Sequence, residues 1–269
     1  IKIVDERENK ACFAGSYYRH HEDRSKDMDR VLDCAAKYGL DIYDRNYEKN
    51  LKGLMPNHMF PDRFKDNIKG SLKYYEIDKA YKGYKVMINV NTVKESPTMF
   101  SRRVFEGLAC GTPVISTYAQ GIEMMFGDLV NISENEQEID HAFNVLLSND
   151  KEYRQKSMLG IRDVLSKHTY TQRLKFICEV AGIPVSYQLP KVTVIALIHA
   201  QDEFFRVLDQ FNRQSYEFKE LYMLVDTFDG YLDLFKKFNT KTVKTFVRSY
   251  MHKYQNMLEW IDSPYVTYF

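Results

Sequence analysis

The chain has 269 residues, with 38 Lys and Arg against 37 Asp and Glu, and its formal charge is +1. That balance excludes a global electrostatic attraction to nucleic acid or anionic lipid. Hydrophobic residues make up 44% and charged residues 28%, which is the balance of a globular protein rather than a disordered chain. The sequence also has no apolar run of membrane length and no signal peptide, so we expect a soluble protein without a membrane span.

Four cysteines lie far apart, without the spacing of a zinc site or a CxxC pair. Cys12, Cys110 and Cys178 have apolar neighbours and are typical of small core residues in a reducing compartment. The chain starts at Ile1 rather than Met and ends inside the apolar run YVTYF. We therefore expect a piece of a longer cytoplasmic protein.

Apolar runs alternate with amphipathic stretches over residues 1–182. Strands are predicted at 10–15, 39–44, 85–91, 113–117 and 129–133, and helices at 25–39, 76–84, 101–111, 137–147 and 151–182. Ser25 is the expected N-cap of its helix and Gly39 the expected stop. Residues 45–70 show no clear pattern. Strands alternating with helices indicate a Rossmann-like, doubly wound parallel sheet of the α/β class.

Residues 183–191, IPVSYQLPK, contain two prolines and are typical of a linker. The alternation restarts after them, over residues 192–269. Strands are predicted at 192–200, 219–226, 243–247 and 265–269, and helices at 202–214, 231–238 and 252–262. We expect a second, partial α/β domain here.

The segment ESPTMFSRRVFEGLACGTPVIST is the most informative stretch of the chain. It predicts a loop that enters a helix N-terminus beside a parallel strand, a place where free N–H groups suit a diphosphate. Ser101 caps this helix or bonds a phosphate oxygen, and Arg103 can meet phosphate with two parallel hydrogen bonds. Glu106 can hold two ribose hydroxyls. The competing interpretation is a surface set of salt bridges among Arg102, Arg103 and Glu106.

This segment, F-E-x-L-A-C-G-T-P-V-I preceded by S-x-R-x, resembles the donor-binding segment of CgeB/YkvP-type glycosyltransferases. FAGSYY, LDIYDRNY, GSLKYYEIDKAYKGYKVMINVN and QGIEMMFGD fit the same family, so the resemblance covers roughly residues 11–177. It implies the C-terminal, nucleotide-sugar-binding half of a GT-B glycosyltransferase. The implied partners are a UDP- or GDP-sugar and a glycan or protein acceptor, and no cofactor is implied for this domain.

The resemblance implies roles for particular residues. It places Glu106 on the ribose and Ser101 and Arg103 near the diphosphate, and it implies that the glycine turn lets the backbone approach the donor phosphates. The full set of implied donor-binding residues is Gly15, Ser16, Asn91, Thr92, Ser101, Arg103, Glu106 and Gly121. Tyr74 and Glu76 are expected near the base.

One departure from the wider retaining class concerns a second Glu, eight positions before the helix Glu. Thr98 stands there in this chain, and Glu95 is nearby but out of register. The Arg and Lys pair that steadies the leaving diphosphate in that class is also missing from its usual pattern. Arg19, Arg24 and Lys94 are the candidate substitutes.

The second unit resembles the first strands of a GT-A, family 2 type of glycosyltransferase. The motif Gln214–Tyr216 matches the Q-x-Y that closes the first helix, and Asp226 ends the next strand where that family places a nucleotide-contacting acid. His199 follows the first strand and completes the implied nucleotide site; an ordinary strand-end turn at Asp226 is the alternative. A complete domain of this family needs Mg²⁺ or Mn²⁺ on a DxD motif, and Asp262 does not belong to one.

The leading hypothesis is a metal-independent sugar transfer in the first domain, with the leaving diphosphate stabilised by a helix N-terminus and Arg103. The sugar would go to a glycan or protein at the bacterial surface. A second hypothesis is a degenerate transferase kept as a scaffold in spore or cell-surface assembly, which the Thr98 position favours. A sugar-nucleotide epimerase is the third, although the acid and base carboxylates that it needs are not evident in the sequence.

Overall fold

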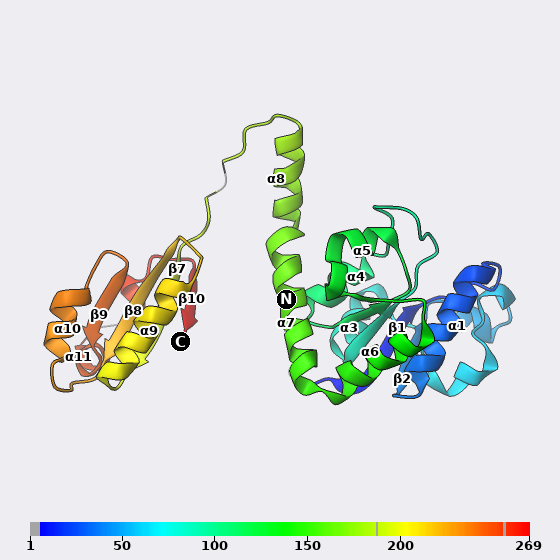
Figure 1. The fold of residues 1–269 in the computed structure, drawn as a ribbon, viewed down its shortest axis with the longest axis horizontal. Helices are drawn as coiled ribbons and strands as arrows, with labels where there is room; N and C mark the ends of the chain where they lie inside the picture. The colour runs from blue at the N-terminus through cyan, green and yellow to red at the C-terminus, as the bar shows by residue number, and fades with distance from the viewer. Residues whose placement is uncertain (1–5, 187, 255–256) are drawn as a thin grey trace. The chain divides into compact units, whose positions relative to one another are not determined.

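The structure is a computed structural model that describes residues 6–186, 188–254 and 257–269. The chain divides into two compact units, Ile1–Ile183 and Pro184–Phe269, each built on its own parallel sheet (Figure 1). Among the described residues, no helix is long and apolar enough to cross a membrane.

The first unit contains a six-stranded sheet in the order β3-β2-β1-β4-β5-β6, and every neighbouring pair is parallel. The strands are β1 (Glu8–Gly15), β2 (Leu40–Asp44), β3 (Ile68–Gly70), β4 (Tyr84–Asn89), β5 (Val114–Ser116) and β6 (Asn131–Ile132). Because the strand order reverses next to β1, the carboxyl ends of β1 and β4 flank the switch point of the sheet. In open α/β sheets, ligands bind at this point.

Helices cover both faces of this sheet. They are α1 (Glu22–Ala36), α2 (Tyr47–Leu51), α3 (Asp78–Lys82), α4 (Arg103–Ala109), α5 (Gln120–Phe126), α6 (Glu136–Ser148), α7 (Asp150–Lys167) and α8 (Tyr170–Val180), with 3-10 turns at Pro56–His58, Asp62–Asn67, Tyr74–Glu76 and Gly127–Leu129. Residues of α1 and α6 share a buried cluster with Ala11 and Phe13, whereas the alternate residues Cys12 and Ala14 pack with α3 on the other face. The period-two alternation of β1 thus places one helix layer on each side.

Two local expectations are corrected by the structure, and one unassigned stretch is resolved. The helix predicted from Ser25 begins at Glu22, and the Ser25 hydroxyl donates to the Tyr18 carbonyl at 2.8 Å instead of capping the helix. The single helix predicted over 151–182 is two helices, because the side chain of Thr169 accepts from the Gln172 backbone N–H and starts α8 afresh. Residues 45–70, for which no pattern was evident, contain the edge strand β3.

The second unit has a four-stranded parallel sheet in the order β10-β7-β8-β9. Its elements are β7 (Val192–Ile198), α9 (Gln201–Arg213), β8 (Lys219–Val225), α10 (Tyr231–Phe238), β9 (Val243–Val247), α11 (Arg248–Tyr254), a 3-10 turn (Met257–Trp260) and β10 (Tyr265–Tyr268). Apolar side chains of α9 and α10 cover one face. The helix predicted over 252–262 includes residues 255–256, which lie outside the described residues.

Candidate functional site

The carboxyl edge of the first sheet is held by a buried amide and hydroxyl network. The Asn91 amide donates to the Thr117 carbonyl at 2.8 Å and to Ser116 Oγ at 3.1 Å, and its Oδ1 accepts from Asn89 at 3.0 Å. Asn91 is 4% exposed, so its side chain is used to tie β4 to β5. Of the two residues predicted at the end of β4, only Thr92 is exposed.

Arg103 turns its guanidinium from the first turn of α4 to the end of β1. Its Nη2 donates to the Ala14 carbonyl at 2.6 Å and its Nη1 to Asn89 Oδ1 at 3.4 Å, and the group lies 5.3 Å from the centroid of the Phe13 ring. Burial lowers the pKa of Arg103. A guanidinium remains charged at neutral pH nonetheless, so a positive charge lies at the carboxyl edge of the sheet.

Arg24 brings a second guanidinium to the same edge from α1. It is 7% exposed, its Nη2 donates to the Ser16 carbonyl at 3.3 Å, and it lies 4.5 Å from the centroid of the Tyr18 ring. Its Nε and Nη1 atoms are buried without a hydrogen-bond partner in the described part of the chain. Burial lowers its pKa to about 10, which still leaves it charged. A buried charge of this kind is costly unless a partner compensates it.

Arg24 also lines a cavity of about 440 Å³ at this edge. We call it the edge cavity; it is lined by Asp23, Arg24, Lys26, Asp27, Arg30, Asn91, Thr92, Lys94, Glu95 and Glu134. Its walls come from α1, from the loop after β4 and from the loop after β6, all of which leave the carboxyl ends of strands. Thr92 and Asn91 both line it, although only Thr92 has a free side chain to offer.

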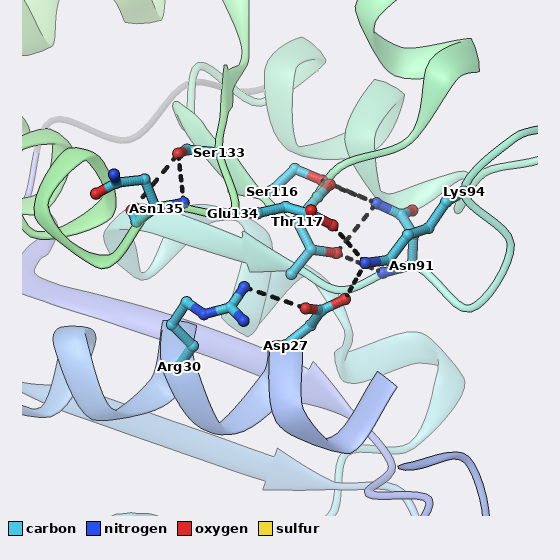
Figure 2. A network of polar contacts seen from close by, with 9 residues as sticks. All are labelled: Asp27, Arg30, Asn91, Lys94, Ser116, Thr117, Ser133, Glu134 and Asn135. Carbon is cyan, nitrogen blue, oxygen red and sulfur yellow. Dashed lines mark hydrogen bonds and ion pairs between the residues drawn. The ribbon is translucent and has the colours of Figure 1, made fainter. Parts of the chain in front are cut away.

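Lys94 lines the edge cavity and is paired with carboxylates in the polar network of Figure 2. Its Nζ forms an ion pair with Asp27 at 2.7 Å and a second one with Glu134. Asp27 is 5% exposed and also pairs with Arg30 at 3.2 Å. The positive charge of Lys94 is therefore already compensated, and of the two cavity-lining candidates for the missing Arg and Lys pair, Arg24 and Lys94, Arg24 is the one without a carboxylate partner among the described residues.

Ser101 and Glu106 lie on either side of the start of α4. Ser101 Oγ accepts from the Arg103 backbone N–H at 3.3 Å. Glu106 pairs with Arg102 at 2.7 Å, and its hydrogen bond contributes, after burial, to raising the pKa of Tyr81. The salt bridge that was the competing interpretation is thus present between Arg102 and Glu106, whereas Arg103 takes no part in it.

Gly15, Ser16 and Gly121 occupy crowded backbone positions. A Cβ on Gly15 would lie 2.8 Å from Phe13 Cζ and 3.2 Å from Arg103 Nη2, so glycine is what lets that guanidinium close on β1. Ser16 is 3% exposed and its Oγ accepts from the Asn46 amide at 3.1 Å. The Gly121 N–H donates to the Ser96 carbonyl at 3.1 Å, so the start of α5 is occupied by the loop after β4.

Two residues of this site are set apart by the fold and not by their sequence pattern. Arg24 was one of three candidate substitutes; its burial sets it apart from Arg19, and its lack of a carboxylate partner among the described residues sets it apart from Lys94. Glu95, out of register in the sequence, lines the edge cavity, whereas Thr98 is not one of its lining residues. The exposed Tyr74 lies close enough to Arg102 for its hydroxyl to raise the pKa of that guanidinium, after the larger contribution of Glu106.

In the second unit, the predicted pair is in contact at the carboxyl edge of the sheet. His199 Nδ1 and Asp226 Oδ2 lie 2.7 Å apart, and Arg248, at the start of α11, reaches the same oxygen at 3.4 Å. Asp262 pairs with Lys191. Among the described residues, no group of three or more His, Cys, Asp or Glu is arranged to hold a metal ion.

Comparison with known proteins matches residues 19–179 to the model of a family described as glycosyl transferase-like. No curated protein matches the sequence. Among solved structures, a TarM mutant of S. aureus in complex with Fondaparinux, alpha-GlcNAc-glycerol and UDP is 12% identical, with a TM-score of 0.46, over 67% of this chain and 37% of that one.

Sucrose-phosphate synthase from Thermosynechococcus elongatus is 15% identical, with a TM-score of 0.45, over 66% of this chain and 46% of its own. A mutant O-GlcNAc transferase of Thermobaculum terrenum is 11% identical, with a TM-score of 0.43, over 67% and 36%. The chain thus spans less than half the length of these structures. The family model covers more than half of the chain, including α1, β4, α4 and all the residues that line the edge cavity, and the chain belongs to the glycosyl transferase-like family.

Proposed function

We propose that the first unit binds a nucleoside diphosphate sugar at the carboxyl edge of its sheet and serves as the donor half of a glycosyltransferase. The observation that carries the proposal is the pair Arg24 and Arg103. Both guanidiniums converge on the end of β1, on the carbonyls of Ser16 and Ala14, and no carboxylate among the described residues forms an ion pair with either. Two cations held together without an anion favour an anionic ligand.

A diphosphate is the anion that this arrangement suits. Guanidiniums bind phosphate oxygens through two parallel hydrogen bonds, and Arg24 has Nε and Nη1 unused. As the sugar leaves, negative charge grows on the diphosphate, and fixed cations in a partly desolvated site stabilise that charge without a metal ion. Arg24 and Arg103 therefore take the place of the missing Arg and Lys pair.

Glu106 and Glu95 are the proposed ligands of the two sugars of the donor. Glu106, at 33% side-chain exposure, is the ribose ligand, with Arg102 as its present partner. Glu95 lines the edge cavity together with Asp27 and Glu134, and we propose that it faces the transferred sugar in place of the second Glu, whose position is taken by Thr98 in this chain. Carboxylates accept two hydroxyl hydrogen bonds each, which is the contact that a hexose offers.

Calorimetric titration of the protein with UDP-glucose and GDP-mannose tests the proposal. We expect one of them to bind, with affinity reduced at least about tenfold in Arg24→Gln and in Arg103→Gln, since each removes a charge-assisted contact of about 1.5–3 kcal/mol. Arg154→Gln, which removes a guanidinium from a surface ion pair on α7, should leave the affinity unchanged. Binding of neither nucleotide sugar to the folded protein would refute the proposal.

The second unit is proposed to bind a nucleotide at His199, Asp226 and Arg248, the three side chains that follow β7, β8 and β9. The number of binding sites per chain, measured in the same calorimetric titration, shows whether one unit or both units bind a nucleotide. If the Arg24→Gln, Arg103→Gln double variant still binds at one full site, and adding Asp226→Ala abolishes that site, a nucleotide site in the second unit is supported. If the wild type has a single site and the double variant loses it, the proposal for the second unit is contradicted.

A scaffold without turnover is the second candidate, favoured by Thr98 in place of the second Glu. Glu106→Ala distinguishes the two in the biological setting of the protein. If the role is lost while the circular dichroism spectrum is unchanged, the transferase is supported; a scaffold would tolerate the change.

A further inference from the structure

Three histidines gather beside Arg24, in a part of the chain that the donor site has not used so far. The ring centroids of His20 and His21 are 4.3 Å apart, and those of His20 and His58 are 5.6 Å apart. His20 and His21 precede α1, whereas His58 comes from the 3-10 turn Pro56–His58, so the cluster joins two segments far apart in the sequence.

Tyr18 lies between this cluster and Arg24. Its ring is 4.9 Å from the His58 ring and 4.5 Å from the Arg24 guanidinium carbon. The His58 Nδ1 donates to the Tyr17 carbonyl at 3.0 Å, because a carbonyl oxygen can only accept. The His58 ring is thereby held next to Tyr18, whereas His20 and His21 are exposed to solvent at the edge of the cluster.

The charged and titratable groups around the cluster come from each element packed against it. They are Tyr17, Tyr18 and Arg19 in the loop after β1, Glu22, Asp23 and Arg24 at the start of α1, and Asp44 at the end of β2. Arg19 donates to the Met59 carbonyl, Glu22 pairs with Lys26, and Asp44 accepts from Asn46 and Asn50. Glu22 and Asp44 thus have partners of their own, and among the described residues no carboxylate forms an ion pair with a ring of the cluster.

Histidine changes its charge between about pH 5 and pH 8. Here partial desolvation, followed by the charges of His21, His58 and Arg24, lowers the pKa of His20. An anion bound to Arg24 would offset the positive charge that lowers the pKa of His20, so anion binding would favour proton uptake there.

We infer that His20, His21 and His58 form a proton-dependent rim of the Arg24 anion site, so that a nucleoside diphosphate sugar binds more tightly as the pH falls and binding takes up protons. The inference rests on the proposed function, because it takes the donor diphosphate as the anion. Arg24 supplies the permanent charge and the histidines supply a charge that varies over the physiological range.

Calorimetry with UDP-glucose and GDP-mannose at about pH 8, 6.5 and 5.5 tests the inference. The two phosphates of a nucleotide sugar are diesters, whose charge is constant over this range, so any change comes from the protein. We expect the dissociation constant to fall about fivefold from the highest to the lowest pH, since partly screened charges within a Debye length act on the anion. Repeating the titration in buffers of different ionisation heat should show net proton uptake.

Two variants test the cluster: the double variant His20→Asn, His21→Asn and the single variant His58→Asn. The control is His141→Asn, on the exposed face of α6. The first two should reduce both the proton uptake and the pH dependence, whereas the control should leave them unchanged. A pH-independent affinity without proton uptake overturns the inference and leaves the donor site intact. Proton uptake that persists when His20, His21 and His58 are all replaced by Asn does the same. Failure of both nucleotide sugars to bind at any pH refutes the donor site and the inference with it.

Discussion

Arg103 Nη2 donates to the carbonyl oxygen of Ala14 at 2.6 Å, across 89 residues of sequence. This contact joins the start of α4 to the end of β1 and holds a cation where the parallel strands end. The neighbouring Gly15 makes it possible, because a side chain there would meet both the Phe13 ring and the guanidinium. The glycine turn therefore leaves room for the Arg103 guanidinium, in addition to the expected approach of a ligand to the backbone.

Gly15→Ala should displace Arg103 and weaken nucleotide-sugar binding. The added Cβ lies 3.2 Å from Arg103 Nη2 and 2.8 Å from Phe13 Cζ, so both side chains have to move, at a cost of about 1–3 kcal/mol in unfolding free energy. We expect about a tenfold loss of affinity, measured by calorimetry. In an Arg103→Met background the same change should cost no further affinity; an equal loss in both backgrounds would show that Gly15 acts without Arg103.

Arg24→Met should stabilise the unliganded protein while abolishing tight binding. The guanidinium is 7% exposed and two of its nitrogens lack partners, so an apolar side chain of similar length relieves a desolvation cost. Against this gain, the substitution removes one hydrogen bond to the Ser16 carbonyl and the stacking of the guanidinium on the Tyr18 ring. We expect the free energy of unfolding in urea to rise by about 1 kcal/mol, which is the usual sign of a residue kept for function.

Arg63→Met is the matched control for this comparison. Arg63 pairs with Asp29 at 2.9 Å and Asp33 at 2.8 Å and lies over the Phe64 ring, so its removal should lower stability. A loss of stability in Arg24→Met as large as in Arg63→Met would mean that Arg24 is structural, and the argument from its missing partners would fail.

Lys94 is expected to stabilise the loop after β4 through Asp27 rather than through Glu134. Asp27 is 5% exposed, whereas the Glu134 side chain is 49% exposed, and exposed pairs contribute less than about 1 kcal/mol. Lys94→Met leaves a buried carboxylate with Arg30 alone, and we expect a loss of about 2–3 kcal/mol in urea unfolding. Glu134→Gln should cost much less, and adding Asp27→Asn to Lys94→Met should restore part of the loss. The reverse order of effects would contradict this assignment.

The sheet was predictable because the strands are short apolar runs bounded by glycine and polar residues, as at 85–91. The break between α7 and α8 was also readable in principle, since Thr169 followed by Gln172 is a capping signal. The start of α1 was misplaced because Ser25 looked like a cap, whereas Glu22 and Asp23 at the helix N-terminus begin the first turn.

The site itself was less predictable, for a physical reason. The residues Ser101, Arg103 and Glu106 were found through their spacing on one helix, and spacing is a local property. Burial distinguishes Arg24 from the exposed Arg19, and the lack of a carboxylate partner distinguishes it from Lys94. Both properties depend on segments that the fold brings together. The histidine cluster joins positions 20 and 58 and has no local pattern at all.

His168 should make the first unit less stable in mild acid. It ends α7 and packs edge-on against Phe105 and Phe126, with ring centroids at 5.2 and 5.4 Å. Burial, followed by the charge of Arg173, lowers the pKa of this imidazole below its ordinary 6.5. The unfolded chain therefore takes up a proton near that pH while the folded protein does not, so stability is full above about pH 6.5 and falls as the pH drops toward the folded pKa. Thermal unfolding at about pH 7.5 and 5.5 should show a smaller acid shift in His168→Phe than in the wild type or in His141→Gln. An equal decrease in the unfolding temperature of all three proteins would mean that other groups cause the acid sensitivity. The packing of His168 between Phe105 and Phe126 would then tolerate the charged imidazolium.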